Sequence, residues 1–301
     1  MPKKRKKDSL SSTVRLILFV LAYFAVLVAW LLHGDNVALF NPKGLIAHEQ
    51  HNLILLVVAI MLVIAIPAVF LFFFTAWKYR ESNTQVQHDP EHRHSRLLVP
   101  AIWLIPITFA LVLSTIMWSA THKLAPQKSI ESNNKPLTIQ VISMRWKWLF
   151  IYPDQHIATV NFVQIPVDTP VTFELTADEA PMSSFWIPNL GGMLYTMTGM
   201  VNHLNLMADT PGDYVGSSAE INGAGFAGMR FTARATSSED FDRWVRSVTV
   251  RRGVLDNFEY DRLLKPSQDN PAAYYSSVDS GLYDKVLMKY MGPGEHMGMG
   301  Y

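Results

Sequence analysis

The chain contains no cysteine among its 301 residues, and its charged residues are few. The lack of cysteine excludes disulfide bonds, thiolate metal ligands, cysteine nucleophiles and thioether lipid anchors. Charged residues make up 17% of the chain, against roughly 25% in soluble domains. The 26 basic and 25 acidic residues give a formal net charge of +1, so there is no electrostatic reason to expect nucleic acid as a partner. The shortage of charge indicates that part of the chain lies out of water.

Three long apolar segments account for this shortage, at residues 16–32, 53–77 and 97–118, and none of them contains a charged residue. About 20 apolar residues suffice to cross a bilayer, whereas a core helix of a soluble domain would carry a polar stripe. The second and third segments are therefore predicted to form a transmembrane helical hairpin. Pro67 and Pro106 lie inside them, which membrane helices tolerate when neighbouring groups satisfy the freed carbonyls.

The first apolar segment has two open interpretations. It follows a basic cluster from Lys3 to Lys7, as the core of a signal peptide would. Its apolar run is longer than the roughly 7–15 residues of a typical signal core, and no clear A-x-A cleavage site follows. We therefore expect a retained N-terminal helix, with a removed signal peptide as the alternative.

Basic residues set the expected orientation, because short loops rich in Lys and Arg stay in the cytoplasm. The N-terminal cluster is basic, and so is the connection between the second and third segments, with Lys78, Arg80, Arg93 and Arg96. Everything after about Thr121 is then exported. We expect a basic N-terminus with the first segment (1–33), the hairpin (34–121), an exported domain (122–238) and a C-terminal extension (239–301).

The exported part alternates apolar and polar residues in short runs. Strands are predicted at residues 137–143, 146–152, 157–164, 171–176, 192–198, 204–208, 214–218 and 229–235. Many short strands separated by Pro, Gly and Asp turns predict an all-β sandwich or barrel. Helical spacing returns after Ser237, an expected N-cap, and again at Tyr283, Val286, Leu287 and Tyr290. Residues 292–301 are expected to be disordered.

Two stretches of the exported part resemble subunit II of the haem-copper terminal oxidases: MRWKW at 144–148, and SSFWIP at 183–188 with GSSAEINGAGFAGM at 216–229. The resemblance implies a cupredoxin-like Greek-key sandwich. In the cytochrome c oxidase branch this domain binds a dinuclear copper centre. Its ligands there are a His before Ser-Phe-Trp, and then Cys-x3-Cys-x3-His-x2-Met around a Glu whose carbonyl also coordinates.

Here the spacing of that motif is kept, but most of the ligands are replaced. The matching positions are Ser183, Ser218, Glu220, Asn222, Phe226 and Met229. A dinuclear copper centre needs soft, deprotonated thiolates to bridge its metals. A serine hydroxyl stays protonated, an amide is a weak ligand and phenylalanine donates nothing. We therefore expect no metal and no cofactor in this chain, and no electron entry from cytochrome c through this site.

This departure is typical of the cytochrome bo-type ubiquinol oxidase branch, which the chain resembles from about Asn41 to Met291. Further matching stretches are NPKG at 41–44, AWKYR at 76–80 and FDRWV at 241–245. The resemblance implies a proton-pumping complex of the bacterial inner membrane that oxidises ubiquinol and reduces oxygen to water. Its haems and one copper would lie in subunit I. This chain would have no catalytic residue; it would pack its hairpin against subunit I in the bilayer, alongside further small membrane subunits, with its periplasmic domain capping subunit I.

Within that comparison, Trp146, Trp148 and Trp186 are expected to be core or interface aromatics. Relatives commonly carry a glutamate at the cytoplasmic start of the third segment, where this chain has Val99. Valine cannot relay a proton, so such a role would pass to Glu91 or to subunit I. Relatives also often carry a lipoprotein cysteine, which is missing here.

Histidines and methionines offer one alternative function. His88, His92 and His94 could suggest a metal loop, although a solvated loop of mixed charge explains them more simply. Met291, His296, Met297 and Met299 carry the thioethers and imidazole that suit copper(I). A membrane-tethered copper carrier or sensor therefore stays open as the second hypothesis. The isolated histidines are expected to be surface or capped residues: His51, His122, His156 and His203.

Overall fold

The computed structural model describes residues 15, 19, 22–26, 29, 37–81, 83 and 98–291. They belong to two compact units, Met1–Pro42 and Lys43–Tyr301. In the first unit, residues 22–26 are helical and a 3₁₀ turn, η1, spans Ala38–Phe40. Most of the predicted first membrane segment lies outside the described residues. So do Glu91, the histidines of the 88–94 loop and the predicted tail at 292–301.

Two long apolar helices open the second unit, α2 (Leu45–Lys78) and α3 (Leu98–Lys123). By length and composition both can cross a membrane. They coincide with the predicted second and third segments, although α2 begins at Leu45 rather than at residue 53. Lys123 Nζ lies 2.8 Å from Glu49 Oε1, which joins the end of α3 to the start of α2, as an antiparallel hairpin requires. The Thr108 and Thr115 hydroxyls donate to carbonyls one turn back, so these polar groups are satisfied within an apolar helix.

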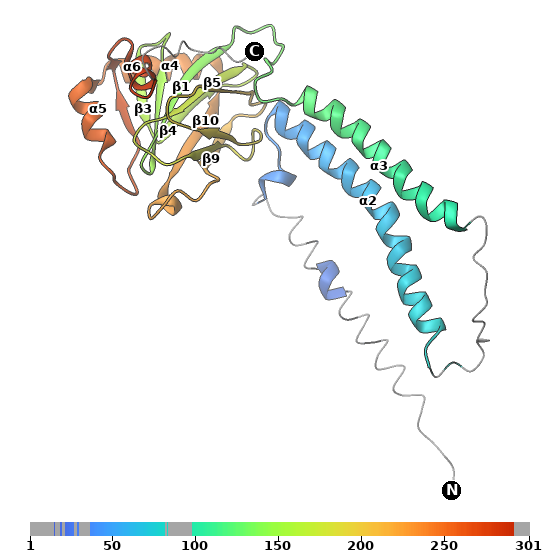
Figure 1. Ribbon diagram of the computed structural model, residues 1–301. Helices are drawn as coiled ribbons and strands as arrows, with labels where there is room; N and C mark the ends of the chain where they lie inside the picture. Colours follow the sequence, from blue (N-terminus) through green and yellow to red (C-terminus); the bar gives the residue numbers. More distant parts are fainter. Residues whose placement is uncertain are drawn as a thin grey trace. The chain divides into compact units, whose positions relative to one another are not determined.

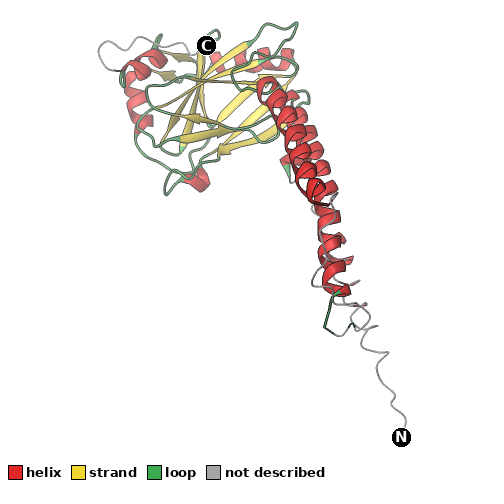
Figure 2. Cartoon of the chain, turned by 45° about the vertical axis from the view of Figure 1, so that its right-hand side comes forward, coloured by secondary structure: helices red, strands yellow, loops and turns green. Residues whose placement is uncertain are grey.

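Most of the strands form two sheets that are typical of a sandwich (Figure 1, Figure 2), and two short strands near the C-terminus pair separately. The larger sheet has the order β12-β3-β2-β1-β5-β8, and the smaller sheet has the order β4-β10-β9-β6-β7. Pairs β1–β5 and β4–β10 are parallel, and the other pairs in these two sheets are antiparallel. The strands of the sandwich are β1 (Leu137–Met144), β2 (Lys147–Tyr152), β3 (Ile157–Val160), β4 (Phe162–Pro166), β5 (Val171–Ala177), β6 (Ser183–Trp186), β7 (Leu194–Thr196), β8 (Asn202–Leu206), β9 (Gly212–Ser218), β10 (Arg230–Thr236) and β12 (Ala273–Tyr275).

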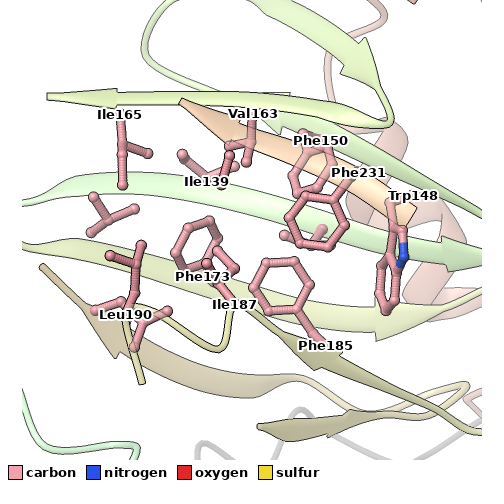
Figure 3. Packing of buried hydrophobic residues seen from close by; sticks show 14 of the residues in the cluster. Ile139, Trp148, Phe150, Val163, Ile165, Phe173, Phe185, Ile187, Leu190 and Phe231 are labelled. Carbon is pink, nitrogen blue, oxygen red and sulfur yellow. The ribbon is translucent and has the colours of Figure 1, made fainter. Parts of the chain in front are cut away.

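An aromatic core fills the space between the sheets (Figure 3). Phe173, Phe185 and Phe231 are buried, and the rings of Phe185 and Phe231 stack with centroids 5.1 Å apart. Trp148 is fully buried at one end of this row and meets both of those phenylalanines edge to face. Aromatic pairs in such geometry stabilise a core beyond the burial of their area.

A second apolar cluster lies on the other face of the larger sheet, where the later part of the C-terminal extension packs, whereas Phe241 and Val248 belong to the first cluster. The extension contains α4 (Ser238–Thr249), β11 (Val254–Leu255), α5 (Asn257–Leu264), β13 (Ser277–Val278) and α6 (Leu282–Met288). Ile142, Leu149 and Ile151 contribute from the sheet, and Tyr260 and Leu287 from the extension. The Ser237 hydroxyl accepts from Asp240 N, which confirms the predicted N-cap.

Some predicted strands were wrong in their limits. Residues 157–164 form two strands, β3 and β4, because Asn161 takes a left-handed backbone (φ 53°) and the chain crosses there from one sheet to the other. The strand expected at 192–198 is confined to β7 (Leu194–Thr196). Strand β6 and helix α5 were not predicted.

Candidate functional site

The positions that match copper ligands come together at one end of the smaller sheet. Ser183 begins β6, Ser218 ends β9, and Met229 lies directly before β10. Strands β6 and β9 are paired, with Phe185 opposite Ser218. Residues 219–229 form the loop between β9 and β10, which we call the ligand-position loop, and Asn222 lies within it. The fold therefore gathers residues from three chain segments into one site.

Asn222 is the centre of the hydrogen bonds in this site. Its Nδ2 donates to Ser183 Oγ at 2.7 Å and to Met229 Sδ at 3.0 Å. All three side chains are buried. An amide thus bridges two of the positions that would otherwise face a metal.

Ser218 forms two further hydrogen bonds at the site. Its hydroxyl donates to Glu220 O at 2.9 Å and accepts from Ser184 N at 3.3 Å. Glu220 therefore contributes its carbonyl to a hydroxyl. Phe226 is half-buried and begins a 3₁₀ turn, η2 (Phe226–Gly228).

This donor set does not fit a dinuclear copper centre. Copper needs free lone pairs from soft donors, but the Met229 sulfur and the Ser183 oxygen both accept from one amide. Asn222 Oδ1 is buried without a partner in the described part of the chain, and a single amide oxygen is a weak ligand for copper. Among the described residues, no group of three or more His, Cys, Asp or Glu could hold a metal ion.

The three tryptophans have different surroundings. Trp146 adopts a left-handed backbone (φ 64°) between β1 and β2, and its Nε1 lies 3.4 Å from Asn222 O. Trp148 belongs to the aromatic core and is no surface residue. Trp186 is half-buried and donates from Nε1 to Gly191 O at 3.2 Å. Of these three tryptophans, Trp146 is the one with a hydrogen bond to the ligand-position loop.

Two buried charged residues near the site were not predicted. Lys147 is 2% exposed, and its Nζ donates to Leu263 O at 2.7 Å and to Lys265 O at 2.8 Å. Burial lowers the pKa of this ammonium. One signal could have found it: Lys147 shares a strand face with Leu149 and Ile151, both apolar.

Asp178 is the second of these residues, and its side chain is 1% exposed. It accepts from the Tyr260 and Tyr290 hydroxyls, each at 2.6 Å, and from Lys289 Nζ at 2.9 Å. Its partners lie far along the chain, so spacing in the sequence could not have identified them.

The start of α2 is fixed to the β domain by backbone contacts. Leu45 N donates to Met207 O at 3.2 Å, and Ala47 N donates to Leu190 O at 3.1 Å. His48 Nε2 lies 3.0 Å from Asp209 Oδ2. The first amides of a helix have no partner within the helix, so the β domain caps α2.

The other histidines do not gather around the site. His122 Nδ1 is bonded to Trp118 O at 2.8 Å within α3. His156 and His203 are exposed, whereas His51 on α2 is partly buried. Val99 is exposed near the start of α3. Of the methionine and histidine tail, only Met291 lies among the described residues.

Two protein families and one solved structure match parts of the chain. Residues 154–236 match the family of the cytochrome c oxidase subunit II periplasmic domain, and residues 252–294 match the COX aromatic-rich motif. The crystal structure of the periplasmic domain of cytochrome oxidase subunit II from Bradyrhizobium japonicum is 20% identical, with a TM-score of 0.37, and covers 40% of this chain and 96% of that one.

Curated relatives extend over most of the chain. The cytochrome bo(3) ubiquinol oxidase subunit 2 of Pseudomonas aeruginosa is 43% identical over 278 residues, which are 92% of this chain and 84% of that protein. The ubiquinol oxidase subunit 2 of Acetobacter aceti is 40% identical over 264 residues, 87% of this chain and 85% of that protein. These relatives do not favour a copper carrier or sensor. The chain belongs to the ubiquinol oxidase subunit 2 family of the haem-copper terminal oxidases.

Proposed function

We propose that this chain is the metal-free subunit II of a proton-pumping ubiquinol oxidase. In this proposal it carries no redox centre and no catalytic residue, and it supports a subunit I that holds the haems and one copper. Electrons from ubiquinol reach those cofactors without passing through this chain. The chain then acts by packing and by completing the complex.

The observation that carries the proposal is the hydrogen-bonded site at Asn222. Asn222 Nδ2 donates both to Ser183 Oγ and to Met229 Sδ, so the soft donor that remains is already used within the protein. The relatives of similar length are named as subunits of ubiquinol oxidases. A site of this chemistry favours a structural role for this chain over a role in carrying electrons.

The same proposal places the chain in the bacterial inner membrane. Helices α2 and α3 would cross the bilayer as a hairpin, with Lys78 and Arg80 on the cytoplasmic side. The domain at 122–238 and the extension at 239–301 would then be periplasmic. Subunit I and further small membrane subunits are the proposed partners of the hairpin, and Trp146 and Trp186 are candidates for an interface.

Purification of the complex from membranes, with an affinity tag after Tyr301, tests the proposal. We expect a haem-containing subunit to co-elute and the preparation to consume oxygen when ubiquinol is added. A lone 34.0 kDa chain would contradict the proposal.

Copper analysis of the same preparation tests the metal-free site. Met229→Leu removes the thioether with little change in volume, at a cost below about 1.5 kcal/mol. We expect the wild type and this variant to contain the same amount of copper per haem. A loss of copper in the variant would mean that the site binds metal.

A further inference from the structure

Residues 252–291, the described part of the COX aromatic-rich motif, are called the aromatic-rich segment below. This segment forms hydrogen bonds with the turn that leads to Ser183. Asp178 and Glu179 lie just after β5, and Ser183 begins β6. The buried Asp178 carboxylate accepts from the Tyr260 and Tyr290 hydroxyls. Tyr290 in turn accepts from Glu179 N at 2.9 Å. Two ends of the aromatic-rich segment, α5 and the residues after α6, thus converge on one turn.

The same segment also forms hydrogen bonds with Lys147, at the start of β2, and with Asn161. The Lys147 ammonium lies 2.7 Å from Leu263 O and 2.8 Å from Lys265 O, at the end of α5. Asn161 Nδ2 donates to Asn270 O at 2.9 Å, while its Oδ1 accepts from Trp148 N. The residues around 263–270 are therefore tied on both sides to the strand that follows Trp146.

Between these attachments, the segment contacts the ligand-position loop itself. A Cβ placed on Gly225 would clash with the Trp146 indole and would lie 2.9 Å from Gln268 Cγ. A Cβ placed on Gly228 would clash with the Asp269 carboxylate. The backbone of the loop thus lies against Trp146 and Gln268 at Gly225 and against Asp269 at Gly228, with no room for a side chain at either glycine.

Apart from the hydrogen bonds at Ser218 and Asn222 and its short turns, the loop has little regular structure. Its only regular element is η2 (Phe226–Gly228), and Ile221 is 76% exposed. Fixing a residue in a single backbone conformation costs conformational entropy, which contacts from outside the loop can offset. We propose that the aromatic-rich segment is an internal clamp that orders the ligand-position loop and the turn before Ser183, so that the site keeps its shape without a metal.

The first test removes the side chains with which the clamp touches the loop. In Gln268→Ala/Asp269→Gly, the backbone of the segment stays and glycine accepts the left-handed conformation at 269 (φ 51°). Hydrogen exchange is measured on the full chain purified from membranes. We expect the amides of residues 219–229 to exchange about tenfold faster, with β1 unchanged. Asp261→Ala, an exposed change on α5, serves as the control that loses the same charge. Unchanged exchange in the loop of the double variant would overturn the proposal.

The second test uses rescue, which a general loss of folding would not show. Gly228→Ala introduces the Cβ that clashes with Asp269, so exchange should rise in residues 219–229 and in residues 265–270. Adding Asp269→Gly removes the clashing carboxylate, and the new methyl group at residue 228 takes its place while Gln268 still contacts the loop at Gly225. Both regions should then return toward wild-type exchange, unlike in the double variant of the first test. Failure of the second change to restore protection would show that the contact does not couple the two regions. Neither readout depends on quinol oxidation, so the clamp and the proposed function can fail separately.

Discussion

Asn222 forms hydrogen bonds with two atoms at positions that match copper ligands, so those atoms are satisfied within the protein. Its amide supplies two donors, and both are used inside the protein, one by an oxygen and one by a sulfur. A buried donor or acceptor that loses its partner costs about 1–3 kcal/mol. The residue that replaces a ligand has therefore become a part of the hydrogen-bonded core.

Asn222→Ala should lower the free energy of unfolding of the β domain by about 1–3 kcal/mol, because Ser183 Oγ and Met229 Sδ each lose a donor. Urea unfolding of the purified full chain, followed by tryptophan fluorescence, measures the change. Asn133→Ala is the matched control, since Asn133 is exposed, and its effect should stay within about 0.5 kcal/mol. Equal effects of the two substitutions would mean that the hydrogen bonds of Asn222 do not stabilise the site.

Tyr275 should make the stability depend on pH in the alkaline range. Burial, together with a hydrogen bond to Glu259, raises the pKa of Tyr275 to about 12. In the unfolded chain tyrosine ionises near pH 10. The stability from this group is therefore complete below about pH 10 and is lost as the pH rises to about 12.

The expected result is a fall in the free energy of unfolding across this window, less steep in Tyr275→Phe than in the wild type. Burial raises the pKa of Tyr152, Tyr260 and Tyr283 still further, so part of the slope should remain in the variant. Urea unfolding at a series of pH values gives both slopes. Identical slopes in the two proteins would contradict the role of Tyr275.

At the scale of elements, the junction between α2 and the β domain depends on close backbone approach. A Cβ on Gly44 would lie 2.6 Å from Met207 O and 3.1 Å from Leu190 Cα, both backbone atoms. Gly44 also forms a β-bridge with Ala208. Backbone atoms cannot turn away as a side chain can, so a larger residue must separate the helix from the domain.

Gly44→Ala is therefore expected to destabilise this junction by about 1–3 kcal/mol, the usual range for overpacking. Gly192→Ala is the matched control, because its Cβ would meet only Gln50 Nε2, at 3.0 Å, the end of a flexible side chain. Thermal unfolding of the purified complex and the amount of the chain in membranes measure both variants. A loss as large in Gly192→Ala as in Gly44→Ala would argue against the backbone contact as the cause.

The elements that were predicted correctly are those with a local signal. Apolar length alone predicted α2 and α3, and Ser237 with the spacing after it predicted α4. The break at Asn161 was missed because its left-handed backbone is fixed by Trp148 and Asn270, which lie elsewhere in the chain. Helix α5 was missed for a related reason: its buried side chain, Tyr260, finds its partner at Asp178, far along the chain.

The site was predictable in part, on different grounds. The resemblance to subunit II implied that Ser183, Ser218, Asn222 and Met229 share one place, and the structure brings them together. The bond from Asn222 to the Met229 sulfur could not be predicted, because it depends on the fold of the loop. The contacts of residues 268–269 with that loop could not be predicted either.

At the scale of the whole molecule, the proposed function requires that the two ends of the hairpin lie on opposite sides of the membrane. Basic residues lie at one end of the hairpin, and the β domain lies at the other. Lys78 and Arg80 follow the apolar part of α2, with Glu81 in the turn after them. Lys78 Nζ lies over the Phe74 and Tyr79 rings, and the Arg80 guanidinium lies over Trp77. Long basic side chains at a helix end favour the membrane interface.

The absence of cysteine makes this topology directly testable. Glu81→Cys and Asp261→Cys each introduce one thiol at an exposed position. A membrane-impermeant maleimide should label Asp261→Cys in cells whose outer membrane has been made permeable, and should label Glu81→Cys only after the inner membrane is broken. The unchanged chain, which has no thiol, gives the background. Labelling of both variants before the inner membrane is broken would mean that α2 and α3 do not place these two residues on opposite sides of it.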